Sequence, residues 1–153
     1  MLFVLFHLGE ERYALDAGQV AEVLPLVAVT PIPHAPGGVA GIFNYRGAPV
    51  PAIDLSQLAL GRPARRRLNT RIILVRYPGD RGATHLLGLI AENATQTLRA
   101  SPAEFKASGV TSPDAPYLGP VVMDTRGAVQ KIELERLLPA GLREQLFRQV
   151  AET

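Results

Sequence analysis

The chain has 153 residues, of which 47% are hydrophobic, and its formal net charge is +2. A chain of this length can fold as one domain without a metal or a disulfide, and this apolar content argues against disorder. The absence of cysteine excludes disulfides, thiolate metal sites and a cysteine nucleophile, and it fits a cytoplasmic protein.

Short apolar runs alternate with Gly, Pro, Asp and Arg clusters, a rhythm typical of an all-β barrel or sandwich. Residues 2–8 predict a strand buried on both faces. This segment lacks the cationic leader and small-residue cleavage site of a targeting signal, and no stretch approaches the roughly 20 apolar residues that span a bilayer. Asp16 can cap one helical turn through Val20, which residues 23–25 then end.

The next segment predicts a loop followed by a hairpin. Residues 30–38 hold three prolines and two glycines and predict the loop. Residues 41–44 and 50–55 predict two strands around a turn at 45–48. Pro49 and Pro51 both lack an N–H, and residues two apart in a strand point their N–H groups the same way. The second arm is therefore predicted to be an edge strand.

Residues 61–69 contain Arg62, Arg65, Arg66 and Arg67 and little apolar content. They predict an exposed, mobile connection and a boundary between two halves of the chain.

The second half continues the strand rhythm. Residues 70–77 and 85–91 predict two strands joined by a turn at 78–82, and residues 95–98 predict a shorter strand. Residues 101–104 form a capping box with proline at the first helical position, a helix start that Gly109 would end. Residues 117–123 and 128–132 predict strands on either side of a turn at 124–127.

The C-terminal segment predicts helix. Pro139 separates its two parts, and each part repeats apolar residues at helical spacing. The apolar positions are Leu134, Leu137, Leu138, Leu142, Leu146, Phe147 and Val150.

The chain lacks the patterns of a catalytic or metal centre. His7, His34 and His85 are scattered, and none has a metal-ligand spacing. The glycine-rich residues 37–41 are followed by no Lys-Ser/Thr pair, and no Gly-x-Ser-x-Gly elbow occurs. We therefore expect no enzymatic activity, no cofactor and no metal.

The arginine cluster offers an alternative function. Arg65, Arg66 and Arg67 could grip phosphates, which would make the chain a small β-barrel nucleic-acid-binding protein. No aromatic residues are interleaved with them to stack on bases, so a solvated loop is the favoured interpretation.

Several segments together resemble the CheW-like family of chemotaxis coupling proteins. The most specific is Asn-x-Arg-Gly at 44–47 followed by Val-Pro-x-Ile-Asp-Leu at 50–55. The resemblance spans roughly residues 1–138, in family order and spacing. Its other segments are residues 13–15, 19–24, 39–43, 70–75, 88–90 and 134–138.

The resemblance implies a mainly β fold of two five-stranded SH3-like barrels packed side by side, with short helices and a C-terminal helix. It implies a single CheW-like domain over 1–153. The approximate subdomains are 16–68 for the first barrel, 1–15 plus 69–138 for the second, and 139–153 for the helix. This helix extends past the usual family body and is expected to cover the second barrel or serve a partner.

The resemblance also implies a non-catalytic adaptor. Its partners would be the regulatory domain of a CheA-type histidine kinase and the cytoplasmic tip of a methyl-accepting chemoreceptor. The protein would be cytoplasmic, recruited to receptor arrays without inserting into the membrane, and would bind no nucleic acid. Flagellar chemotaxis and another chemosensory pathway both remain open, as does an orphan regulatory module that has lost its kinase.

Family positions carried onto this sequence give the candidate protein-binding residues, and they imply an ion pair between Glu22 and Arg46. For the aliphatic members, plain core packing is the competing interpretation. The candidates are Val20, Glu22, Val29, Gly41, Asn44, Arg46, Ile72 and Thr97.

Overall fold

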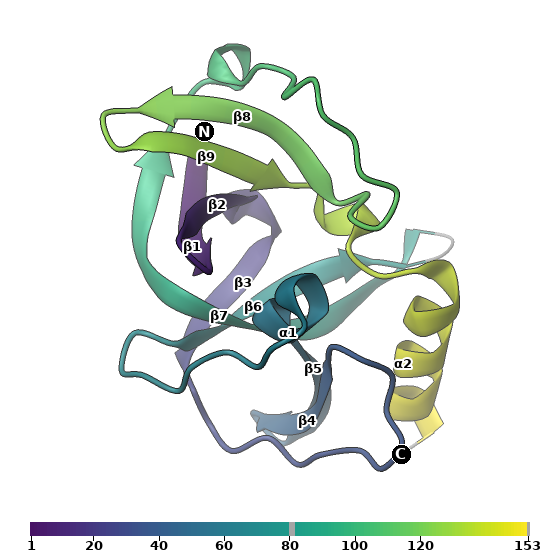
Figure 1. The fold of residues 1–153 in the computed structure, drawn as a ribbon. Helices are drawn as coiled ribbons and strands as arrows, with labels where there is room; N and C mark the ends of the chain where they lie inside the picture. Colours follow the sequence, from purple (N-terminus) through teal and green to yellow (C-terminus); the bar gives the residue numbers. More distant parts are fainter. Residues whose placement is uncertain (80–81, 153) are drawn as a thin grey trace.

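The computed structural model describes the backbone of residues 1–79 and 82–152 and the side chains of these residues up to 147. This part of the chain is mainly β (Figure 1). The strands are β1 (Leu2–Leu8), β2 (Glu11–Asp16), β3 (Val20–Pro25), β4 (Val39–Tyr45), β5 (Ala48–Asp54), β6 (Arg71–Pro78), β7 (Thr84–Arg99), β8 (Leu118–Asp124) and β9 (Gly127–Ile132). The helices are α1 (Leu55–Leu60) and α2 (Ala140–Glu152), with 3₁₀ turns η1 (Ala17–Gln19), η3 (Pro102–Glu104) and η4 (Leu134–Arg136).

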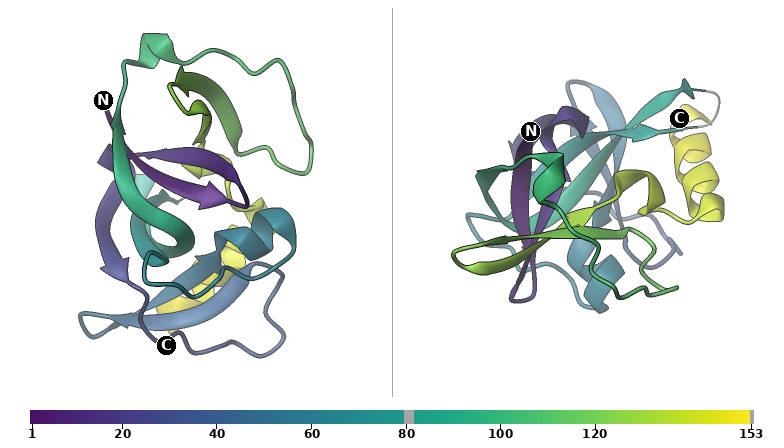
Figure 2. Two further views of the ribbon diagram at one scale, coloured as in Figure 1. Left: turned by 60° about the vertical axis from the view of Figure 1, so that its left-hand side comes forward. Right: turned by 90° about the horizontal axis from the view of Figure 1, so that it is seen from above.

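One long strand, β7, belongs to both halves of the molecule. Its first part pairs with β6 and, in parallel, with β5, while its second part pairs with β1. The first half is therefore the five strands β3-β6-β7-β5-β4, and the second half is β7-β1-β2-β9-β8. The two halves lie side by side (Figure 2). The predicted fold class, two five-stranded SH3-like subdomains with short helices and a C-terminal helix, is confirmed.

The prediction of two separate strands in β7 is wrong. Residues 84–99 form one continuous strand, which bends where Asn93 adopts a φ of 51°. Its register with β1 shifts at this point, because Leu5 pairs with Gln96 and His7 with Glu92. A bulge bends a strand without ending it, so the polar residues 92–93 mark a corner and not a break.

The strand pairing groups residues differently from the expected subdomains, which were 16–68 for the first barrel and 1–15 plus 69–138 for the second. Residues 71–91 lie in β6 and the first part of β7, and they pair with β3 and β5. By strand pairing they belong with the first half.

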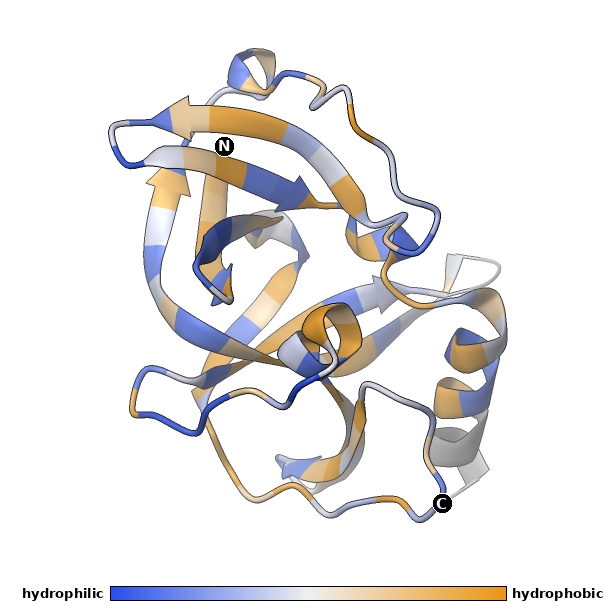
Figure 3. Ribbon diagram, viewed as in Figure 1, coloured by the Kyte–Doolittle hydropathy of each residue, from blue (hydrophilic) through white to orange (hydrophobic). Residues whose placement is uncertain are grey.

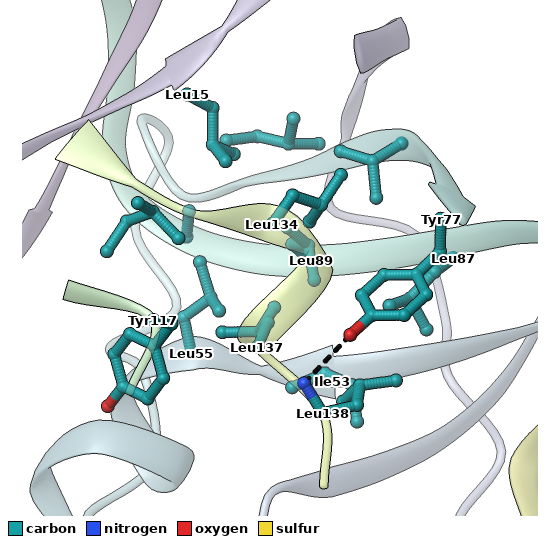
Figure 4. Close-up of a cluster of buried hydrophobic side chains, with 14 of the residues drawn as sticks. Leu15, Ile53, Leu55, Tyr77, Leu87, Leu89, Tyr117, Leu134, Leu137 and Leu138 are labelled. Atoms are coloured by element: carbon teal, nitrogen blue, oxygen red, sulfur yellow. Dashed lines mark hydrogen bonds between the residues drawn. The ribbon is translucent and has the colours of Figure 1, made fainter. Parts of the chain in front are cut away.

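The long apolar runs of β1 and β6 are explained by burial on both faces, as predicted for β1. Alternate side chains of a strand point to opposite faces. In β6, Ile72 and Leu74 face the core of the first half, whereas Ile73, Val75 and Tyr77 face a larger cluster between the halves, here called the seam core. Figure 4 shows part of the seam core: Leu15, Ile53, Leu55, Tyr77, Leu87, Leu89, Tyr117, Leu134, Leu137 and Leu138.

The predicted hairpin at 41–55 is present as β4 and β5. Over Ala48–Pro51 the strand β5 has only β4 as a neighbour, which suits the two prolines. The edge-strand prediction fails from Ala52 to Asp54, because these residues also pair with β7.

Helix α1 directly follows β5 and was not predicted. Its signals are Asp54, whose carboxylate accepts the Gln57 N–H at 3.2 Å, and Gly61 at the C-cap with φ 74°.

Asp16 was predicted to cap a helical turn through Val20 that residues 23–25 would end, and the turn is confirmed as η1 (Ala17–Gln19), with the Asp16 side chain accepting the Gly18 N–H. The residues after it instead form strand β3, paired with β6. Tertiary pairing with a buried neighbour overrides the local signal there.

The C-terminal helix packs against β5 and, through Phe147, against Tyr77 and His85, which strand pairing places in the first half. Phe147 of α2 stacks on His85 with ring centroids 4.3 Å apart, and Leu146 and Phe147 belong to the seam core. Figure 1 shows α2 beside the β6–β7 end of the molecule. Val150 lies outside the described side chains, as do residues 80–81 of the predicted turn.

The capping box at 101–104 is confirmed, but its helix ends at Glu104, before Gly109.

A partly buried ion pair ties the two-stranded β8–β9 layer to β2 and predicts an acid-sensitive stability. Arg12 donates to both carboxylate oxygens of Asp124, one bond being 2.8 Å, and lowers the pKa of Asp124 from 3.8 to about 2. A lowered carboxyl pKa adds stability above pH 4 that is lost as the pH falls toward 2. We expect the wild type to lose about 1 kcal/mol more than Asp124→Asn between pH 5 and pH 2.5, as measured by urea unfolding. Parallel pH profiles for the two proteins would contradict this.

Candidate functional site

The tip of the β4–β5 hairpin carries a cluster of polar side chains that reaches across to β3. Its members are Glu22 of β3 and Tyr45 and Arg46 at the hairpin turn, here called the hairpin cluster. The Tyr45 hydroxyl donates to a Glu22 carboxylate oxygen at 2.8 Å, and the Arg46 guanidinium contacts the same oxygen at 3.2 Å. The predicted Glu22–Arg46 ion pair is confirmed.

The turn itself places Arg46. Arg46 and Gly47 both adopt positive φ, 52° and 87°, as the two central residues of a tight hairpin turn require. Asn44 stabilises the turn, since its Oδ1 accepts the Gly47 N–H at 2.7 Å. Asn or Gly would occupy the Arg46 position with less backbone strain. The arginine side chain therefore has a role that backbone geometry alone does not explain.

Electrostatics and ring contact hold the cluster in one geometry. The guanidinium carbon of Arg46 lies 5.1 Å from the centre of the Tyr45 ring. The hydrogen bond to Glu22 raises the pKa of the Tyr45 hydroxyl. Yet the Arg46 side chain is 75% exposed, so most of it remains open to a partner. Sequence reasoning missed Tyr45, whose position beside Arg46 in the turn was the available signal.

Gly41 allows the loop after β3 to approach β4 closely enough for their backbones to pair. Thr30 and Ile42 exchange two backbone hydrogen bonds, of 2.8 and 2.9 Å, which join the loop after β3 to β4. Gly41 has φ 146°, and a Cβ built on it would lie 2.0 Å from the Thr30 carbonyl oxygen. The structure therefore gives Gly41 a backbone role. The edges of the first half, β3 and β4, are thus linked twice: by this bridge and by the hairpin cluster.

The aliphatic candidates differ in how deeply their side chains are buried. Ile72 is fully buried in the first-half core, so its side chain is unavailable to a partner and its assignment as a contact residue is wrong. Val20 is half-buried and packs against the seam core. Val29 is half-buried against the first-half core, near the hairpin.

Thr97 lies apart from the hairpin cluster, in the second part of β7, where it pairs with Val4. It is exposed and lines a shallow hollow next to the bend of β7. The hollow also takes in Val23 of β3 and Arg71 of β6, so it bridges the two halves. Val23, which is 38% exposed, is a surface aliphatic residue that sequence reasoning missed. Val23 is exposed between half-buried Glu22 and Leu24, and this alternation can be recognised only once β3 is known to be a strand.

Apolar surface surrounds these polar groups. Val27, in the loop after β3, is 40% exposed. A second hollow lies beside the hairpin and is lined by Thr30, Ile42, Phe43, Asn44, Gly47, Ala48 and Pro49. Figure 3 shows hydrophobic and hydrophilic segments alternating along this lower part of the molecule. An apolar surface with a fixed charged centre is typical of a protein–protein contact.

The described residues contain no group of three or more His, Asp or Glu side chains placed to hold a metal ion. The histidines stay separate: His7 lies 3.3 Å from the amide nitrogen of Asn93, and His85 stacks on Phe147. Among the residues with a described position, no helix combines the length and the apolar character that crossing a membrane requires.

Comparison with known proteins yields consistent matches. The family model of the CheW-like domain matches residues 2–141. The chemotaxis protein CheW of Rhizobium meliloti is 25% identical over 143 residues, which cover 92% of this chain and 89% of that protein. The CheW of Treponema pallidum is 48% identical over a shorter stretch of 52 residues, 34% of this chain and 31% of that protein.

A solved structure agrees in fold. The scaffolding protein TtCheW from Thermoanaerobacter tengcongensis superposes with a TM-score of 0.80 at 28% identity, covering 95% of this chain and 92% of that one. These similarities give no support to the alternative of a nucleic-acid-binding barrel. Because the family model spans nearly the whole chain, this protein belongs to the CheW-like domain family.

Proposed function

We propose that this chain is a non-catalytic adaptor of chemotaxis signalling that couples a chemoreceptor to a CheA-type histidine kinase. Membership of the CheW-like family and the likeness to a scaffolding protein support the adaptor role. The kinase contact is assigned to the hairpin cluster with Val29 and Asn44 beside it. The receptor contact is assigned to the hollow that holds Val23 and Thr97.

The observation that carries the kinase assignment is the state of Arg46. Its guanidinium is fixed by Glu22 and Tyr45, and 75% of the side chain is still exposed. A charged group that is already ordered loses little conformational entropy on binding. A kinase regulatory domain with the same fold can pack the end of one of its sheets against the apolar surface around Arg46.

The receptor assignment follows from the position of the hollow at Thr97. It spans β3, β6 and the bend of β7, so it lies where the two halves meet. The helical tip of a receptor presents aliphatic residues at helical spacing, and a shallow cleft lined by Val23 and Thr97 can accept such a helix. On this arrangement the two partners use different parts of one surface and can bind together.

The test of the proposed function is the variant Arg46→Glu. We expect it to fold normally but to bind a CheA-type regulatory domain at least about tenfold more weakly, because a reversed charge now faces Glu22 and the partner. Titration calorimetry with the purified regulatory domain measures this.

Arg126→Glu is the matched control. Arg126 is also an exposed arginine in a hairpin turn, between β8 and β9, so its reversal changes the net charge equally. We expect it to leave kinase binding unchanged. Equal affinities for the Arg46→Glu variant and the wild type would refute the assignment.

A further inference from the structure

The loop of residues 61–69, here called the arginine loop, holds the whole positive excess of the chain. It contains four arginines, Arg62, Arg65, Arg66 and Arg67, and no acidic residue. Since the full chain has a formal net charge of +2, the remainder carries −2. The net positive charge of the chain thus comes from one connection, between α1 and β6.

The arginine loop is anchored to the body of the protein. The Ala64 N–H donates to the Asp54 carboxylate at 2.9 Å, and Ala64 itself is buried. At the other end, Thr70 is buried, its hydroxyl donates to the Arg65 carbonyl, and its N–H donates to the Arg67 carbonyl at 3.0 Å. The connection predicted to be mobile is therefore held at both ends, and its backbone presents the arginines in a set arrangement.

The side chains of the arginine loop are turned to solvent. Arg62, Arg65, Arg66 and Arg67 are exposed. The ion pairs Arg12–Asp124 and Arg46–Glu22 include none of these four arginines. Directly after the arginines, Leu68 is 99% exposed, and Leu60, just before the loop, is 41% exposed.

We propose that the arginine loop docks on the surface of an anionic lipid bilayer. Clustered arginines attract lipid phosphates, and an apolar side chain next to them can enter the boundary between headgroups and acyl chains. The fully exposed Leu68 favours a lipid surface, because a polyanion such as RNA offers nothing apolar to receive it. The loop has no aromatic residue on which a nucleotide base could stack.

A bilayer is also a better geometric match than a peptide. The loop runs along the outside of the body before it joins β6 (Figure 3), and a broad surface can meet such a segment without a groove. The membrane contact uses other residues than the hairpin cluster and the lining of the hollow at Thr97.

The test is co-sedimentation of the full chain with vesicles of phosphatidylglycerol and phosphatidylcholine, 30% anionic, against pure phosphatidylcholine vesicles. We expect binding to the anionic vesicles only, weakening as NaCl rises from 50 to 300 mM. The triple variant Arg65→Gln, Arg66→Gln, Arg67→Gln should bind about 100-fold more weakly, about fivefold per arginine removed. Leu68→Ser should weaken binding a few-fold and leave its salt dependence unchanged.

The control is a second triple variant that removes the same charge elsewhere, Arg99→Gln, Arg126→Gln, Arg136→Gln, all exposed positions. It should bind vesicles within about twofold of the wild type, because these arginines lie outside the loop. Equal losses in the two triple variants would overturn the proposal, since the effect would then be one of net charge. No binding to anionic vesicles would overturn it too, as would binding to RNA or polyglutamate in their place.

Discussion

Replacing Tyr77 with alanine should lower the free energy of unfolding by about 3–5 kcal/mol, the usual range for deleting a large buried ring. Tyr77 is fully buried at the centre of the seam core, where strands of the first half meet the C-terminal segment. Its ring packs 5.9 Å from that of Phe147. Loss of the ring would open a cavity between β6, η4 and α2, and urea unfolding measures the cost.

The hydroxyl of Tyr77 makes a separable contribution. It accepts the Leu138 N–H at 2.9 Å, as Figure 4 shows, and burial raises its pKa. Tyr77→Phe keeps the ring but leaves the buried Leu138 N–H without that acceptor, which should cost about 1–2 kcal/mol.

Tyr13→Phe is the matched control for the hydroxyl. Tyr13 is half-buried, and its ring stacks on Phe6 at 6.0 Å. No hydrogen bond of its hydroxyl occurs within the described structure, so its removal should change stability by less than about 0.5 kcal/mol. If Tyr77→Phe were as stable as Tyr13→Phe, the hydrogen bond to Leu138 would not tether the C-terminal segment.

Gly41→Ala should be the second large effect, lowering the free energy of unfolding by about 3 kcal/mol. The added Cβ would lie 2.0 Å from the Thr30 carbonyl oxygen, and the φ of 146° is one that alanine rarely adopts. Backbone must move to relieve the clash, which breaks the Thr30–Ile42 pair. Gly37→Ala is the control, because a Cβ at Gly37 meets nothing within 4 Å.

The same variant tests whether Gly41 acts through the fold or through contact. If its role is to hold β4 against residue 30, Gly41→Ala should lose stability and kinase affinity together. A variant with wild-type stability and weakened kinase binding would instead make Gly41 a contact residue. Thermal melts and calorimetry on one preparation separate the two outcomes.

Local signals of the sequence determined most of the elements. Short apolar runs bounded by turn residues predict β1, β4, β6, β8 and β9, and in β1 and β6 the run is continuous because both faces of the strand are buried. The Asn44–Gly47 turn could be predicted because its signals act within the turn itself: Gly47 tolerates positive φ, and the Asn44 side chain accepts the Gly47 N–H. The Glu22–Arg46 pair came from the family resemblance, and the structure confirms it.

Only the tertiary structure decided the features that depend on distant partners. Whether β7 bends or ends, whether Ile72 faces solvent or core, and which half α2 covers all depend on packing between segments far apart in the chain. An apolar residue gives the same sequence pattern whether it lies in a core or at an interface, because the hydrophobic effect is not directional. The sequence therefore determined the family and most of the strands, while the packing of the strands determined which of their side chains remain free to bind.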